Sequence, residues 1–347
     1  MSDVKRKIAE ASARARRTLY DLDATSLAEL EVLYHEVLML IRVDLQALAG
    51  PTGTVALEQL ERLRERIGAE LRLLAAEQQA LLDAALRQAA TLGAAGFAAA
   101  SAEIQVDRLA VEAVRFVRGF VAEDGLTLSD RLWRLTEGTE KRILDVITQQ
   151  VILGHDASRA ADALLRFGSG LTPELIDQMG VHRVSALQTA VEDALMTGAM
   201  NPYDQARRLM RTELNRAHGE AYRAGMLSTP GVVGEKFTLS PMHRVVDECD
   251  FHAEANLYGL GAGVYPVGLS PWPAHPNTFS FLQPVFADEV SAADREGRSD
   301  GREVLDGLDD AALEAVLGNK DKAQAYREGK VGPQDVLTPW RELEGRL

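Results

Sequence analysis

The sequence contains one cysteine, few aromatic residues and no long apolar run. A single cysteine among 347 residues excludes an intrachain disulfide framework and is typical of a reducing compartment. Aromatic residues make up 5% of the chain and hydrophobic residues 46%, which favours helices rich in Leu and Ala over sheets rich in Tyr, Val and Ile. No run of about 18 apolar residues occurs, so we expect no membrane span. The first residues, MSDVKRKIAEAS, lack the apolar centre expected of a secretory signal.

Basic residues are outnumbered by acidic ones. The chain has 38 Lys and Arg against 52 Asp and Glu, a formal charge of -14 and a pI near 5.1. Such a surface repels phosphate unless the basic residues are segregated, so bulk nucleic-acid binding is not expected. The chain is long enough for two or three domains.

The N-terminal region predicts long helices. Ser26 and Glu29 form a capping-box pattern, which predicts a helix that starts there and stops before Gly50 and Pro51. The next apolar stripe has the spacing of a helix that packs lengthwise on another, and consists of Leu60, Leu63, Ile67, Leu71 and Leu74. This stripe predicts either a docking helix for another subunit or a hairpin with the first helix.

The next segments predict weaker and shorter helices. Residues 89–102 are almost pure Ala and Gly, which indicates a weak helix or a joint because little apolar area is available to bury. A helix is expected over 104–120. Ser129 predicts the start of another helix, with Trp133 on its core face and Gly154 as its stop.

Further helix starts are expected at Asp156 and at Thr172 with Pro173. Helices are also expected over 181–196 and 203–226. The last of these helices carries the densest positive charge in the chain, namely Arg207, Arg208, Arg211, Arg216 and Arg223. This basic strip predicts either a contact with DNA or an acidic partner, or an ion-paired helix with Glu213 and Glu220 as internal partners.

Residues 237–286 form a compact segment rich in Gly and Pro that cannot continue a helix. It predicts a small sheet or hairpins, with strands over 232–239, 264–265 and 279–282. Thiol, imidazole and carboxylate groups suitable for a metal are carried by Cys249, Asp250, His252 and His275. A structural zinc site usually needs a second ligand pair, which does not follow, so no metal and no cofactor is favoured. The favoured interpretation is that Cys249 is a small buried hydrophobe.

The same segment resembles the C-terminal domain of the phage Mu F-like minor head proteins, also called phage head morphogenesis proteins. The motifs that carry the resemblance are, in order, Arg211-Thr212-Glu213-x-Asn215-Arg216-Ala217, Leu239-Ser240-Pro241, His243, Asp247-x-Cys249-Asp250, Tyr258-Gly259-x-Gly261-x-Gly263-Val264-Tyr265-Pro266 and Pro273-x-His275-Pro276-Asn277. The chain departs from the family where His252 and the Thr278-Phe279-Ser280 stretch replace cysteines. These departures predict that any metal role of relatives is absent or weakened here.

The resemblance implies a function in procapsid assembly. It predicts a minor capsid protein of a tailed phage or phage-like particle, located in the virion near the portal, and in the host cytoplasm during assembly. Its partners would be the portal and other head proteins, with a weak contact to packaged DNA and possible ejection with that DNA. The implied structural or interaction residues are Arg211, Glu213, Asn215, Asp247, Cys249, Tyr265, His275 and Asn277.

Two other function classes stay open. A hydrolase or nuclease would use Cys249, His252 and His275, although 237–286 contains no G-x-S-x-G, H-E-x-x-H or phosphate-loop motif. A DNA-binding accessory of the virion would use the basic helix. The favoured prediction is a non-enzymatic structural protein.

The predicted fold class is mainly α, with long N-terminal helices and a helical bundle followed by a small α+β, loop-rich C-terminal module. The predicted divisions are a helical arm over 1–120, a helical core over 121–230, the loop-rich module over 231–286, and a linker with short helices over 287–347. Within the last division, helices are expected over 309–317 and 320–328, and Trp340 is expected to pack onto a neighbour.

Overall fold

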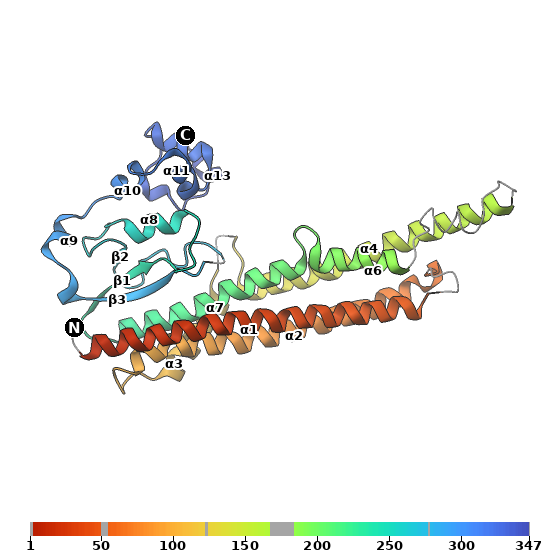
Figure 1. Ribbon diagram of the computed structural model, residues 1–347, viewed down its shortest axis with the longest axis horizontal. Helices are drawn as coiled ribbons and strands as arrows, with labels where there is room; N and C mark the ends of the chain where they lie inside the picture. The colour runs from red at the N-terminus through yellow and green to blue at the C-terminus, as the bar shows by residue number, and fades with distance from the viewer. Residues whose placement is uncertain (1–2, 50–54, 122–123, 167–183, 277, 347) are drawn as a thin grey trace. The chain divides into compact units, whose positions relative to one another are not determined.

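The computed structural model describes residues 3–49, 55–121, 124–166, 184–276 and 278–346, with the backbone alone for 153–166. The structure is 69% helical, and its described residues form one small sheet, so the predicted fold class is confirmed (Figure 1). Among the described residues, no helix is both long and apolar enough to cross a bilayer. The helix start predicted at Thr172 and Pro173 lies outside the described residues.

The helices that precede the sheet in the chain include the long ones. They are α1 (Asp3–Ala47), η1 (Leu57–Gln59), α2 (Leu60–Ala98), α3 (Val106–Gly119), α4 (Leu128–Arg166), α6 (Val184–Glu192), the π-helix η2 (Asp193–Thr197) and α7 (Pro202–Leu227). The C-terminal part contains β1 (Val232–Thr238), α8 (Glu248–Glu254), β2 (Val264–Tyr265), β3 (Phe281–Phe286), η3 (Ala287–Glu289), α9 (Ala292–Glu296), α10 (Arg302–Asp306), α11 (Asp310–Leu317), α12 (Lys320–Arg327), η4 (Pro333–Asp335) and α13 (Trp340–Glu344).

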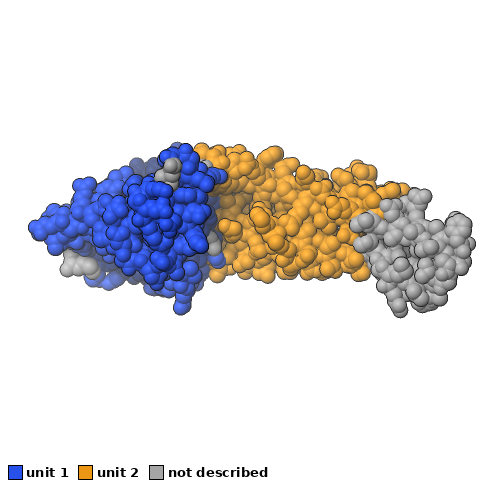
Figure 2. Space-filling view, turned by 90° about the horizontal axis from the view of Figure 1, so that it is seen from above, with its two compact units in different colours: residues 1–21, 86–117, 211–347 blue, residues 22–85, 118–210 orange. Residues whose placement is uncertain are grey.

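The chain divides into two compact units (Figure 2). Unit 1 comprises 1–21, 86–117 and 211–347, and unit 2 comprises 22–85 and 118–210. Each unit is therefore assembled from separate stretches of the sequence.

Helix α1 begins much earlier than predicted. It starts at Asp3 and runs without interruption to Ala47, so the predicted start at Ser26 is wrong. No Gly or Pro interrupts this span, and Ser26 is buried within the helix instead of capping it. Its end at Ala47 agrees with the predicted stop before Gly50.

Unit 2 is a helical bundle in which α1 and α2 contact each other. Tyr34 on α1 donates a hydrogen bond to Gln78 on α2, with 3.1 Å between Oη and Oε1. Arg66 on α2 forms an ion pair with Asp44 on α1. The apolar stripe of α2 is buried, with Leu63 and Ile67 inaccessible to solvent. The hairpin interpretation of that stripe is therefore confirmed, because the chain itself covers it.

Helix α4 differs from the prediction at its start, on its surface and at its end. The cap at its start is Thr127, whose hydroxyl accepts from the Asp130 amide while Asp130 accepts from the Thr127 amide; Ser129 is therefore not the cap. Trp133 is 63% exposed, so its predicted place on the core face is wrong. The helix passes through Gly154 and ends at Arg166, which also removes the separate helix expected at Asp156.

Unit 1 contains a three-stranded antiparallel sheet with the order β2-β1-β3. The central strand β1 pairs Glu235 with Tyr265 of β2 and with Pro284 of β3. Two of the strands lie where the sequence predicted them. The third lies over Phe281–Phe286 and not over 279–282; its proline is tolerated because β3 is an edge strand.

The Ala-rich segment is part of a continuous helix and not a weak joint. Helix α2 runs to Ala98, and Ala89, Ala90 and Ala94 are fully buried. A Cβ on Gly93 would overlap the backbone carbonyl of His218 on α7. The small side chains therefore allow α2 and α7 to approach closely within unit 1.

The C-terminal part of unit 1 has a second core. The predicted loop or linker over 287–304 contains the short helices η3 and α9 and the start of α10, so it is not a loop throughout. The helices predicted over 309–317 and 320–328 are confirmed as α11 and α12. Trp340 packs against the core cluster formed by these helices, as expected.

We expect His218 to make unit 1 sensitive to acid. Burial, and secondarily the charge of Arg16, lowers the pKa of His218 to about 3 from an ordinary 6.5. Because the folded-state pKa is depressed, the neutral ring stabilises the protein above pH 6.5, and that stability is lost as the pH falls toward 3. By pH 5.5 the free energy of unfolding should have fallen by about 1 kcal/mol.

Denaturant unfolding at pH 7.5 and 5.5 measures this loss. His218→Leu should reduce the acid-dependent loss by about 1 kcal/mol, whereas His35→Leu, a substitution at an exposed position of α1, should leave it unchanged. An unchanged pH dependence in the His218 variant would contradict this assignment.

Candidate functional site

The candidate site is built around the first turn of α8. Asp247 is the N-cap of this helix, and its Oδ1 accepts from the Cys249 amide at 2.8 Å. Asp250 completes the capping box by accepting from the Asp247 amide at 2.9 Å. An Asp at this position stabilises a helix start because it satisfies amides that have no partner within the helix. The cap therefore fixes the carboxylate of Asp247 and the thiol of Cys249 relative to each other.

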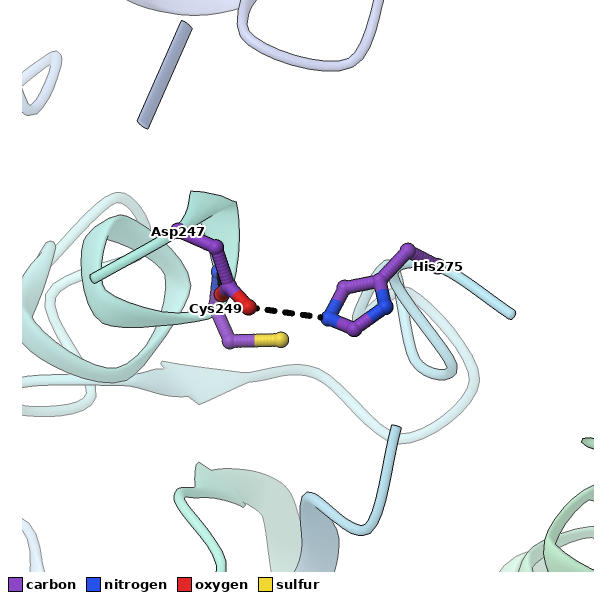
Figure 3. A group of neighbouring side chains, drawn as sticks. All are labelled: Asp247, Cys249 and His275. Atoms are coloured by element: carbon purple, nitrogen blue, oxygen red, sulfur yellow. Dashed lines mark hydrogen bonds and ion pairs between the residues drawn. The ribbon is translucent and has the colours of Figure 1, made fainter. Parts of the chain in front are cut away.

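His275 contacts this helix start from the 273–276 loop, which comes later in the sequence (Figure 3). Its Nε2 lies 3.2 Å from Oδ2 of Asp247. One ligand atom each from Asp247, Cys249 and His275 lie within 4.8 Å of one another. The structure thus brings together two of the four predicted metal candidates, Cys249 and His275, with Asp247, which the sequence analysis placed among the structural residues.

The protonation of His275 is determined by its two neighbours. Its Nδ1 lies 2.9 Å from the carbonyl oxygen of Pro276, which can only accept, so Nδ1 carries a hydrogen. The Nε2 atom is buried, and no hydrogen bond with good alignment reaches it from the described residues. If Nε2 had no hydrogen, its lone pair and a lone pair of the Asp247 carboxylate would repel each other. A cation must therefore lie between them, either a proton on Nε2 or a metal ion.

The proton is the simpler occupant. Asp247, followed by Cys249, raises the pKa of His275 to about 11. Burial acts to raise the pKa of Asp247, but its interactions with His275 and with the Cys249 amide outweigh burial and lower it. Both shifts describe an imidazolium paired with a carboxylate at neutral pH.

A metal ion also fits the donor set. Cys, His and Asp are all zinc ligands. The hydrogen bond from Nδ1 of His275 to the Pro276 carbonyl fixes the tautomer whose Nε2 can bind a metal. If zinc binds, Asp247, Cys249 and His275 would hold it, and it would cross-link the helix start to the 273–276 loop. Cys249 is fully buried, so its thiol is poorly placed to attack a substrate.

The other two metal candidates lie apart from this group. Asp250 pairs with His243, with 2.8 Å between Oδ2 and Nε2, and these two form a second cluster with Asp247. His252 faces Tyr265, with 3.1 Å between Nδ1 and the phenol oxygen. Burial lowers the pKa of His252 to about 4, so the ring is neutral and belongs to the core.

The predicted structural residues of α7 contact the same module. The side-chain amide of Asn215 donates to the carbonyl of Thr278 at 2.9 Å. Glu213 is fully buried and accepts from Arg216 at 2.7 Å. The guanidinium of Arg211 lies 4.9 Å from the ring centre of Phe279. Asn277 lies outside the described residues.

The sequence analysis missed a deeply buried ion pair of the module. Glu235 of β1 is fully buried and accepts two bonds from Arg223 of α7, each 3.1 Å long. Glu235 also accepts from the Ser270 amide at 3.0 Å, and Arg223 donates to the Ser270 carbonyl at 3.0 Å. The signal available in the sequence was that Glu235 lies two positions before Phe237 and therefore on the same face of the strand.

A close contact between a loop and helix α7 also escaped the sequence analysis. Trp272 lies against Gly219 of α7, where a Cβ would overlap the indole ring. The indole nitrogen donates to the Ser280 carbonyl at 2.6 Å. The absence of a side chain at Gly219 therefore allows the loop to dock on the helix.

Comparison with protein families, curated proteins and solved structures finds no match to this chain. The family resemblance of the loop segment therefore depends on its own residues alone.

We expect the buried pair to be required for stability. Glu235→Gln removes one charge and leaves Arg223 partly uncompensated in a buried site, although Glu220 still contacts it at 3.0 Å. The free energy of unfolding should fall by about 3 kcal/mol. Denaturant unfolding measures the change, and Glu254→Gln, at an exposed position of α8, should cost less than about 0.5 kcal/mol. Equal effects of the two substitutions would refute the role of the pair.

We expect His275 to be doubly protonated at neutral pH. Nitrogen-15 NMR of the ring should show two protonated nitrogens at pH 7.5, because the pKa is about 11. In Asp247→Asn the pKa should fall by one or more units, since the carboxylate that favours the charged ring is lost. A metal-coordinated Nε2, accompanied by one equivalent of zinc in elemental analysis, would contradict the proton assignment.

Proposed function

We propose that this chain is a minor head protein of a tailed phage or phage-like particle, acting in procapsid assembly near the portal. One observation carries the proposal. The motifs that resemble the phage head morphogenesis proteins come from separate stretches, and they meet in one folded module. Within it, Asp247 caps α8, Asn215 ties α7 to the loop, and Tyr265 contacts His252.

The contacts of these residues favour a structural role over a catalytic one. The thiol of Cys249 is fully buried, and the same core contains Trp272 and Phe237. A nucleophile needs access to its substrate and a base that is free to accept its proton. His275 instead interacts with Asp247, and its raised pKa leaves it charged at neutral pH. The hydrolase or nuclease alternative is therefore the weaker proposal.

The arginines of α7 also favour a structural role. Arg216 pairs with Glu213, and Arg223 pairs with Glu220 and Glu235. Guanidinium groups held by internal carboxylates are poorly available to phosphate groups. These contacts support the ion-paired interpretation of the basic strip over the DNA-binding one.

Unit 2 offers a surface suited to a protein partner. Three exposed apolar side chains on α1, Val32, Met39 and Val43, share one helix face because they are spaced by seven and four residues. The exposed Leu40 extends this apolar surface to one side. Contiguous exposed apolar groups commonly mark protein interaction sites. We propose the portal protein as the partner of this face.

Copurification with the portal protein of the same genome tests the proposal. The wild-type chain should be retained by immobilised portal protein and should not be retained by a tail-tube protein of that genome. If the wild-type chain is not retained by the portal protein, or is retained equally by the tail-tube protein, the assembly function is refuted.

Two substitutions test the proposed face separately. Val32→Glu with Val43→Glu should weaken portal binding about tenfold or more, since both side chains would carry charge into an apolar contact. Leu73→Glu, at another exposed apolar position of unit 2, is the matched control and should retain binding. Equal binding of portal protein by the two variants would show that this face of α1 is not the contact surface. The assembly function itself is tested by the wild-type chain alone.

A further inference from the structure

Unit 1 contains a pocket of about 190 Å³ that none of the site residues line. It lies between the start of α1, α7 and the strands β1 and β3. Its lining includes three cationic side chains, Lys5, Arg16 and Lys236, and one carboxylate, Glu289. A locally positive pocket stands out in a chain with a formal charge of -14. This asymmetry directs attention to what the cations face.

The charge of Lys5 is matched within the protein. Its ammonium group contacts Asp288 and lies 3.4 Å from an oxygen of Glu289. The other oxygen of Glu289 accepts from the Phe286 amide at 2.8 Å. Lys5 and Glu289 therefore neutralise each other and form one wall of the pocket.

Arg16 and Lys236 have no such match. Neither forms an ion pair with any acidic group in the parts of the chain that the structure describes. Arg16 is half-buried, and its guanidinium lies 3.9 Å from the ring centre of Phe281. Burial is the main cause of a lowered pKa at Arg16, because a partly desolvated charge without a counterion is destabilised. An anion entering the pocket would relieve that cost.

The neutral lining supplies further donors and an apolar wall. Ser12 is buried and accepts from the Tyr222 hydroxyl at 3.1 Å, which leaves its own hydrogen to donate. The oxygen of the Gln283 amide accepts from Thr238 at 3.1 Å, so its NH₂ group is the part left for a ligand. The rest of the wall is apolar, formed by Ala9, Pro284, Val285 and Phe286.

We propose that this pocket binds a small organic anion, with a carboxylate held by Arg16 and Lys236 and a short apolar body against Pro284 and Phe286. The pocket volume of about 190 Å³ is comparable to that of an engineered protein cavity of roughly 150 Å³ that binds benzene, so a carboxylate with four or five carbons fits. Arg and Lys supply charge-assisted hydrogen bonds to carboxylate oxygens. The apolar wall favours this class over inorganic phosphate, which has no group to place there.

Two sources of such a carboxylate are compatible with the pocket, a free short-chain acid and the C-terminus of a peptide. Calorimetric titration of the full-length chain at low salt compares pentanoate, N-acetyl-alanyl-valine, pentanamide and inorganic phosphate. Pentanoate should bind saturably, and pentanamide and phosphate should bind at least tenfold more weakly. Tighter binding of the dipeptide than of pentanoate would identify the peptide terminus as the source, and the reverse would identify the free acid.

Substitutions locate the binding. Arg16→Gln and Lys236→Gln should each weaken pentanoate binding about tenfold, because each removes one charge-assisted contact. Arg17→Gln is the matched control, since Arg17 is the next residue on α1, is exposed, and does not line the pocket. Lys236 is exposed, so its substitution tests the site even if Arg16→Gln impairs folding. The proposal is overturned if phosphate or pentanamide binds as well as pentanoate, or if Lys236→Gln and Arg17→Gln bind it equally.

Discussion

The module of unit 1 depends on a carboxylate buried without access to water. Glu235 lies at the centre of the sheet, and its charge is stabilised by Arg223 and by the Ser270 amide. A buried charge costs several kcal/mol unless paired and hydrogen-bonded. Helix α7, the strand β1 and the 266–276 loop must therefore meet in one arrangement. This requirement explains how a segment rich in Gly and Pro adopts a defined structure.

Helix α8 connects this arrangement to the rest of unit 1. Cys249 belongs to the core that contains Phe237 and Trp272, whereas Phe251 belongs to the core of the C-terminal helices. A helix of seven residues has little stability alone, so its cap at Asp247 and these two cores hold it in place. The pair of Asp247 with His275 joins the cap to the loop. The candidate site thus lies where several separate stretches of the chain are held together.

Local patterns predicted much of the fold. The apolar stripe at Leu63 and Ile67, the strand β1 and the helix α11 lie where local sequence patterns predicted them. The errors arose where tertiary packing overrides local signals. Ser26 resembles a cap but lies within a helix that no Gly or Pro interrupts, and the Ala-rich end of α2 is stable because Gly93 allows α7 to approach. The sequence could nominate Cys249 and His275, but spacing does not reveal that Asp247 completes the group or that Glu235 pairs with Arg223.

Hydrogen exchange of the Ser270 amide tests the central claim most directly, because this amide donates to the buried Glu235 carboxylate. If the charge network holds the loop on α7, the amide should exchange at least a hundredfold more slowly than in an unstructured peptide, with protection near that of β1. Exchange at the unstructured rate, with β1 still protected, would contradict the account, because the loop would then open without breaking the sheet.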